Sequence, residues 1–259
     1  MIVLKKLARG FGYSHVLAIV GLLLMPFAAS GTIDTNQYLT AEQQIELLDM
    51  LPPPPEGAEQ NADLASVRSV RESATPKQLA EAKTEGTLSL RIFAPAIKEF
   101  AQPGKFPEFE KFFDRIHRES DQVVELGKAR WKRLRPLNAD PTINQGVHDE
   151  SYSYPSGHST GATLYALLLA EIFPDQKTEI MNIGRQTGWH RVQLAMHYPT
   201  DIYAGRTLAR AILRQLKTNT AFQHDFEQVQ AEVAKRLIHA NIFHPGNRTA
   251  KPLAAGSIK

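Results

Sequence analysis

An apolar segment with almost no polar face, residues 159–173, most constrains the fold of this chain. A helix that is apolar nearly all round has to be buried by other elements. The apolar residues elsewhere recur with the period of a helix, and no convincing alternation of four or more residues indicates a strand. The sequence therefore predicts an all-α fold, a single compact helical domain with a buried central helix.

Helical patterns flank this segment on both sides, and two of them begin with capping signals, at Thr40 and at Thr75-Pro76. The longest pattern should stop at Pro136, because proline breaks the hydrogen-bond ladder of a helix. Residues 137–155 lack an apolar period and are expected to form a polar loop. In chain order, we expect helices over residues 41–50, 61–74, 77–85, 108–134, 159–173, 175–188, 200–216 and 221–240.

The first thirty residues have the three-part layout of a secretory signal. Basic residues precede an apolar run over residues 16–25, and small residues follow it. The run is shorter than the roughly 20 residues that a membrane-spanning helix needs. We expect residues 1–30 to be a signal peptide and residues 31–259 to be the mature protein, periplasmic or secreted, with no membrane attachment after cleavage.

Cysteine is absent from the chain, which excludes disulfides and thiolate metal sites. The net charge of +3 comes from 30 basic and 27 acidic residues, and three of the basic residues lie in the expected signal peptide. The mature protein is therefore close to neutral. Nonspecific nucleic-acid binding depends on a surplus of basic charge, so we expect no nucleic-acid partner.

The segment Pro155-Ser156-Gly157-His158 stands where the polar loop enters the central helix. Free backbone N–H groups and the positive end of the helix dipole make such a position a phosphate site. Gly157 lets the backbone approach an anion, Ser156 can donate a hydrogen bond and His158 can donate a proton. The alternative interpretation is an ordinary serine-capped helix with an incidental histidine.

A basic pair, Lys128 and Arg135, is separated by six residues. On one helix these residues would lie two turns apart on one face, so that both charges could reach one anion. Arg130, Lys132 and Arg133 surround the pair, and a solvated basic face is therefore the alternative.

Arg191, His197 and Asp201 lie around a second junction between a loop and a helix. If Asp201 accepts the Nδ1 proton of His197, the Nε2 lone pair of this histidine is free to attack. A metal site is the competing interpretation, but the cations nearby would repel a divalent ion. We expect no metal here.

Taken in chain order, these motifs resemble the three-part signature of the type 2 phosphatidic acid phosphatase superfamily, which also includes vanadium-dependent haloperoxidases and membrane-embedded lipid phosphatases. The segment Tyr38-Leu39-Thr40, followed by Leu51 and the prolines 52–55, is similar to the mature N-terminus of the class A bacterial nonspecific acid phosphatases. The resemblance covers residues 38–240 and is strongest over residues 128–206.

The resemblance implies that residues 31–259 form an acid phosphatase domain with its catalytic signature over residues 128–201. Such an enzyme hydrolyses a broad range of small-molecule phosphomonoesters without a cofactor or metal. It implies that His197 is the nucleophile and forms a phosphohistidine, that Asp201 orients it, and that His158 protonates the leaving alcohol and then activates water. The phosphoryl oxygens would be held by Lys128, Arg135, Ser156, Gly157 and Arg191. The family often forms oligomers, so a homo-oligomer is also expected.

One residue departs from the family pattern, because His190 stands where a serine usually precedes the arginine that aligns with Arg191. A histidine there could crowd the site, supply another proton carrier or face away. Two alternative functions stay open: a vanadate-dependent haloperoxidase, since a phosphate site can hold vanadate, and a non-catalytic phosphate-binding protein.

Overall fold

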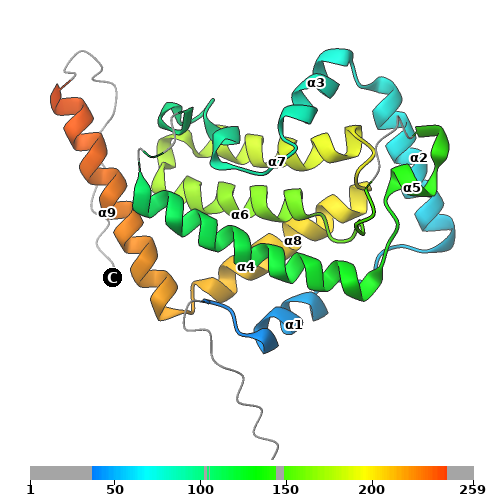
Figure 1. Ribbon diagram of the computed structural model, residues 1–259, viewed down its shortest axis with the longest axis horizontal. Helices are drawn as coiled ribbons and strands as arrows, with labels where there is room; N and C mark the ends of the chain where they lie inside the picture. Colours follow the sequence, from blue (N-terminus) through cyan, green and yellow to red (C-terminus); the bar gives the residue numbers. More distant parts are fainter. Residues whose placement is uncertain (1–36, 102–103, 105, 144–148, 244–259) are drawn as a thin grey trace, which may run out of the picture. The chain divides into compact units, whose positions relative to one another are not determined.

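The computed structural model describes residues 37–101, 104, 106–143 and 149–243. The expected signal peptide lies outside these residues. Within them the structure consists of helices, turns and loops and contains no strand (Figure 1), which confirms the all-α prediction. The α-helices are α1 (Ala41–Asp49), α2 (Gly57–Ser73), α3 (Pro76–Thr84), α4 (Pro107–Trp131), α5 (Pro136–Ala139), α6 (Gly157–Ile172), α7 (Lys177–Gln193), α8 (Pro199–Leu216) and α9 (Thr220–Phe243), and short 3-10 helices are η1 (Leu90–Phe93), η2 (Lys98–Ala101), η3 (Pro141–Ile143) and η4 (Pro174–Gln176).

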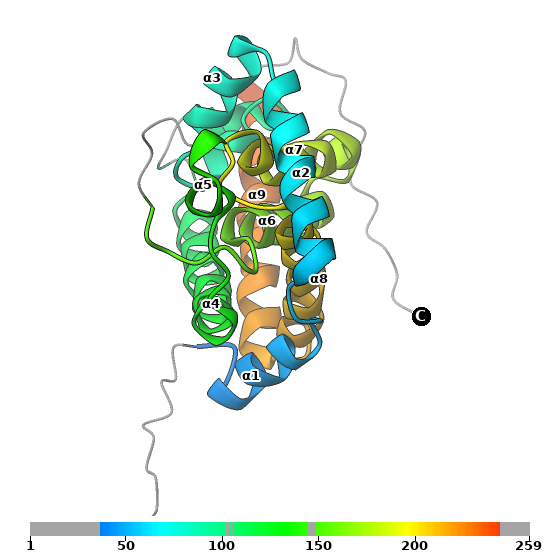
Figure 2. The same cartoon turned by 90° about the vertical axis from the view of Figure 1, so that its right-hand side faces the viewer.

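Helix α6 is the buried central helix that the sequence predicts. Helices α4, α7 and α8 pack against it (Figures 1 and 2), and Leu164, Leu168 and Leu169 are completely buried between them. Leucine side chains that leave water in this way supply the main favourable term in folding. The first turn of α6 is thereby held in a fixed place among three neighbouring helices.

Glycines allow α7 and α8 to approach α6 very closely. A Cβ atom at Gly184 of α7 would lie 2.8 Å from the Cβ of Ala166. A Cβ atom at Gly205 of α8 would lie 2.7 Å from the carbonyl oxygen of Ser156, which precedes the first residue of α6. The three helices therefore touch partly through backbone atoms.

Aromatic rings fill the space between α4 and α9. Phe109 and Phe113 of α4 are completely buried, and the ring of Phe112 lies 5.6 Å from that of Phe222 and 5.8 Å from that of Phe226. Rings at such separations add to the free energy gained from burial alone. The apolar face that the sequence predicts for α4 is thus the face that packs into the core.

Two helix starts agree with the capping signals, whereas several helix bounds differ from the prediction, and α5 and η3 lie where a polar loop was expected. Thr40 and Thr75 both form capping boxes. Helix α4 ends earlier than predicted because Lys132 adopts a left-handed conformation with φ of 49°. Helix α7 extends beyond residue 188 to Gln193. No helix of the described residues is long and apolar enough to cross a membrane.

Candidate active site

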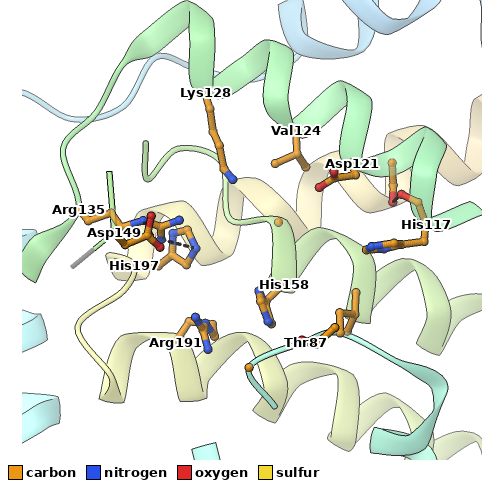
Figure 3. Close-up of a pocket in the computed structure, with 14 residues that line it drawn as sticks. Thr87, His117, Asp121, Val124, Lys128, Arg135, Asp149, His158, Arg191 and His197 are labelled. Atoms are coloured by element: carbon orange, nitrogen blue, oxygen red, sulfur yellow. Dashed lines mark hydrogen bonds and ion pairs between the residues drawn. The ribbon is translucent and has the colours of Figure 1, made fainter. Parts of the chain in front are cut away.

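A cavity of about 320 Å³ opens between α4, α6 and α7 (Figure 3). Two of the eight predicted site residues, Ser156 and Asp201, lie behind its wall and are fully buried. Figure 3 shows Lys128 reaching into the cavity from α4 and Arg191 from the opposite side, on α7. The other six predicted site residues line the cavity: Lys128, Arg135, Gly157, His158, Arg191 and His197.

His197 lies between α7 and α8 and is buried. Its Nδ1 is 2.8 Å from the carbonyl oxygen of Ser153, and its Nε2 is 3.1 Å from Nη1 of Arg135. A carbonyl only accepts and a guanidinium only donates, so these partners place the proton on Nδ1 and the lone pair on Nε2. Burial, and then the charges of Arg135 and Arg191, hold the pKa of His197 well below its ordinary value. The ring is neutral, with a lone pair on the cavity side.

Asp201 does not accept the Nδ1 proton directly, and this detail of the prediction is wrong. Its Oδ2 is 3.5 Å from Nδ1 of His197, while the carbonyl of Ser153 is closer. The hydroxyl of Ser153 donates to Oδ2, and Oγ lies 3.3 Å from Nδ1. The carboxylate of Asp201 therefore acts on His197 through its charge and through the hydroxyl of Ser153.

Arg133 is the arginine that neutralises Asp201, and the sequence pattern did not single it out. Its Nη1 contacts Oδ1 of Asp201 and its Nη2 lies 2.7 Å from Oδ2 of Asp63. Its guanidinium carbon also lies 3.8 Å from the ring centre of Tyr198. Interpreting this residue as part of a solvated basic face is wrong, because its side chain is only 5% exposed. Because Arg133 lies in a run of basic residues, the sequence pattern did not reveal its role.

Lys128 and Arg135 do not lie on one helix, contrary to the prediction. Helix α4 ends at Trp131, and Arg135 stands at the start of α5. The left-handed residue Lys132 reverses the chain between them, so the two cations reach the same cavity from different directions. The amino group of Lys128 is 2.7 Å from a carboxylate oxygen of Glu125, on the same helix.

Arg135 is held rigidly in the wall of the cavity. Its Nη2 donates to the hydroxyl of Ser151 at 2.6 Å, and its Nη1 donates to the carbonyl of Met196 at 2.8 Å. A carboxylate oxygen of Asp149, a residue that the sequence pattern did not identify, is 3.2 Å from its Nε. The guanidinium is therefore already oriented before any ligand binds.

Arg191 is the cation with an unused donor. It lies in the last turn of α7, and its Nε is buried without a hydrogen-bond partner in the described residues. Burial, and then the charge of Arg135, lower its pKa to about 10, so the group is still a cation at neutral pH. Buried donors in native proteins are nearly always paired. This donor is buried beneath the cavity surface, and what Arg191 brings to the cavity is the positive charge of its guanidinium.

His158 lies in the first turn of α6, and its Nε2 is 3.0 Å from the carbonyl oxygen of Glu85. Burial, and then the charge of Arg191, lower its pKa to about 4. Ser156 caps α6, because its Oγ accepts from the N–H of Ser159 at 3.3 Å. Both interpretations of the sequence thus hold in part: the serine is a cap, and the histidine lines the cavity.

His190 does not line this cavity. Its Nδ1 is 3.0 Å from a carboxylate oxygen of Glu85, and it lines a second cavity of about 480 Å³. Of the three expectations for this residue, facing away from the phosphate-binding residues is the one that the structure shows. Among the described residues, no three side chains of the metal-binding types lie close enough together to hold an ion.

Comparisons with known proteins agree with this arrangement. Residues 120–222 match the family model described as PAP2 superfamily. A non-specific acid phosphatase of Providencia stuartii is 27% identical over 76% of this chain and 85% of its own length, and an acid phosphatase of Zymomonas mobilis is 28% identical over 75% and 78%. A non-specific acid phosphatase of Salmonella typhi is 25% identical over 85% of this chain and 92% of its own. The chain is thus similar to the PAP2 superfamily over residues 120–222, and its similarity to acid phosphatases extends over most of its length.

Proposed function

We propose that this chain is an acid phosphatase that hydrolyses small phosphomonoesters through a phosphohistidine on His197. The observation that carries the proposal is the cavity that Lys128, Arg135 and Arg191 line together with His197, whose Nε2 carries a lone pair. Cations that neutralise its charge and a neutral nucleophile suit a phosphoryl group. The names of the acid phosphatase relatives support the same reaction.

In the proposed complex, the phosphoryl oxygens replace weaker hydrogen-bonding partners of the residues that line the cavity. The guanidinium of Arg191 attracts the phosphate by its charge, and Lys128 exchanges its exposed partner Glu125 for the phosphate. Nη1 of Arg135 transfers its hydrogen bond from Nε2 of His197 to an oxygen, which releases the lone pair. The backbone of Gly157 contributes a donor at the start of α6, and Ser156, buried behind the cavity wall, is the cap that holds this helix start. Charge that develops during transfer is stabilised by these fixed donors.

The proposed reaction has two steps, transfer of the phosphoryl group to His197 and hydrolysis of the phosphohistidine. Nε2 of His197 forms a bond to phosphorus while the bond from phosphorus to the ester oxygen breaks, and protonated His158 gives its proton to the leaving alcohol. Neutral His158 next takes a proton from water, whose oxygen attacks phosphorus and releases His197. A phosphate dianion near His158 opposes the charge of Arg191 and favours the protonated ring.

The location, the requirements and the assembly of the enzyme are also part of what we propose. Residues 1–30 act as a signal peptide, residues 31–259 form the acid phosphatase domain, and the mature protein works in the periplasm or outside the cell. We also propose a broad range of phosphomonoester substrates, independence of metal ions and cofactors, and assembly into a homo-oligomer. The layout of residues 1–30 and the sequence resemblance support these parts.

The test is hydrolysis of a generic aryl phosphate by the purified protein between pH 4 and pH 8, with and without a metal chelator. We expect phosphate release that the chelator does not reduce, and a loss of at least about a thousandfold in His197→Ala, because the nucleophile is gone. His224→Ala is the matched control, since His224 is exposed on α9. Turnover that survives in His197→Ala contradicts the mechanism.

The alternative functions predict different results in the same assay. A vanadate-dependent haloperoxidase oxidises halide when vanadate and peroxide are both present, whereas simple inhibition by vanadate fits the phosphatase. A binding protein retains phosphate without any hydrolysis. Either outcome would replace the proposed function.

A further inference from the structure

We propose that Glu85 and His190 form a positioning pair that decides which ring nitrogen of His158 carries the mobile proton. The inference rests on the proposed role of His158 as acid and base. The proposed pair assigns a role to His190, the residue that departs from the family pattern and lies outside the active-site cavity.

One residue, Glu85, contacts both histidines. Its backbone carbonyl is 3.0 Å from Nε2 of His158, and its carboxylate is 3.0 Å from Nδ1 of His190. The side chains of Glu85 and His190 are only 16% and 19% exposed, so the contact is shielded from most of the solvent. Glu85 thus joins the end of α3 to α6 through its backbone and to α7 through its side chain.

The carbonyl of Glu85 fixes the tautomer of His158. A carbonyl oxygen only accepts hydrogen bonds, so Nε2 of His158 has to carry a hydrogen atom whenever this bond is made. The proton that moves during the reaction is therefore the one on Nδ1. The imidazolium loses its Nδ1 proton to the leaving oxygen, and the neutral ring regains a proton at Nδ1 from water.

The carbonyl of Glu85 needs to be held in place, because only a short segment of the chain lies between the two cavities. The residues that follow Glu85 separate the two cavities, and Thr87 lines both of them. The hydrogen bond between Glu85 and His190 ties this segment to α7, directly beside Arg191, the phosphate-binding arginine of the proposal. Other charged groups around the second cavity are Glu81 and Arg91, and neither has a hydrogen bond to His190.

The pair thus couples two parts of the proposed reaction. Adjacent residues of α7, His190 and Arg191, place the carbonyl that orients the acid and a cation that holds the phosphate. A serine at position 190 has no ring nitrogen to offer the carboxylate. The histidine therefore makes a contact behind the wall of the active-site cavity that a serine would not make.

The kinetic test compares Glu85→Ala, His190→Ala and the double variant with Glu81→Ala, a matched control on α3 whose carboxylate is exposed. We expect each Glu85 or His190 variant to lose about three- to tenfold in kcat, with KM changed less than twofold, because one net hydrogen bond is lost. The double variant should be no worse than the single ones, because both break the same contact. Glu85→Gln should retain most of the activity, since its amide oxygen also accepts.

The pH profile separates positioning from mere stability. The hydrogen bond to Glu85 raises the pKa of His158, so loosening it should move the alkaline limb of kcat to lower pH in the Ala variants and leave it in place in Glu81→Ala. Variants that melt at a lower temperature but keep the wild-type kcat and pH profile would overturn the proposal. Additive losses in the double variant would overturn it as well.

Nitrogen-15 NMR of the histidine rings tests the tautomer without any turnover. We expect the wild-type ring of His158, assigned by the signal that is missing in His158→Gln, to be in the Nε2–H form, and Glu85→Ala to populate both forms. A wild-type ring in the Nδ1–H form, or an unchanged ring in Glu85→Ala, overturns the inference. Failure of the proposed function is distinguishable, because wild-type protein would then hydrolyse no phosphomonoester whatever the tautomer.

Discussion

At the scale of single residues, the candidate active site depends on a buried carboxylate whose charge is matched from within the protein. Asp201 has no exposure to solvent, and it is bound by Arg133, by the hydroxyl of Ser153 and by the N–H of Tyr198 at 2.9 Å. Burial raises the pKa of Asp201, and the charge of Arg133 opposes that shift. Removing one member of such a buried set leaves an uncompensated charge, which is costly.

Arg133→Met should therefore lower the free energy of unfolding by about 3 to 5 kcal/mol, because it leaves both Asp201 and Asp63 buried without their cation. Urea denaturation, monitored by circular dichroism, measures this free energy of unfolding. Arg130→Met is the control: Arg130 pairs with Asp49 at 2.6 Å, but the two side chains are 47% and 55% exposed. Its loss should cost less than about 1 kcal/mol. Equal losses in the two variants would contradict the role given to Arg133.

His158 predicts a pH dependence of stability in the protein without phosphate. Its pKa is about 4 in the folded protein and about 6.5 in an unfolded chain. Between these values the unfolded chain binds more protons, so the free energy of unfolding falls as the pH falls from 6.5 to 4. In His158→Gln this fall should be smaller by on the order of 2 kcal/mol, since solvent screens part of the shift. Identical pH dependence in both proteins contradicts the prediction.

At the scale of elements, the first turns of α6 and α8 are bonded to each other. The N–H of Ser156 donates to the carbonyl of Asp201 at 3.2 Å, and the hydroxyl of Ser159 donates to the carbonyl of Ile202 at 2.8 Å. One of these turns carries His158, and the other follows His197 directly. The relative position of the two histidines is thus set by the contact between two helix starts.

Gly205→Ala should disturb this contact. The added Cβ would lie 2.7 Å from the carbonyl oxygen of Ser156, a distance that real Cβ atoms do not adopt, so α8 has to move away from α6. We expect the free energy of unfolding to fall by about 1 to 3 kcal/mol and kcat for an aryl phosphate to fall with it. Thr207→Ala, at an exposed position of the same helix, should change stability by less than about 0.5 kcal/mol. Wild-type kcat in Gly205→Ala would show that the contact does not position the site.

At the scale of the whole molecule, the protein folds around a cavity whose three cations outnumber its two carboxylates, Asp121 and Asp149. Lys128, Arg135 and Arg191 all line it, and the charge of Arg135 contributes to lowering the pKa of Arg191. Such a site is unfavourable when empty and favourable when an anion is bound. A ligand that binds only the folded state stabilises it by mass action.

Inorganic phosphate at a hundredfold excess over its Kd should therefore raise the free energy of unfolding by about 2.7 kcal/mol. Differential scanning fluorimetry detects this as a rise in Tm of several degrees. Sodium chloride at the same ionic strength is the control for general screening and should have a much smaller effect. In Arg191→Met most of the gain should disappear, because one of the three cations that line the cavity is gone. Equal shifts with phosphate and chloride would contradict a specific anion site.

Much of this structure could be predicted from local patterns in the sequence. The capping boxes at Thr40 and Thr75 involve residues three positions apart, and the apolar character of α6 is visible in a single stretch. Such signals act within a few residues of the chain, so the sequence by itself determines where most helices begin and which of them is central. The three-part signature also indicated the residues that meet in the cavity, although their catalytic roles stay predictions.

The partners of these residues depend on how distant segments of the chain pack together. Arg133 and Asp201 are 68 positions apart, and nothing in a run of basic residues distinguishes the buried arginine from its exposed neighbour Arg130. The left-handed turn at Lys132 and the contact of His190 with Glu85 were equally invisible in the pattern. The reason is physical: burial and charge compensation depend on atoms that come together only when distant segments pack, whereas helix formation depends on neighbours along the chain.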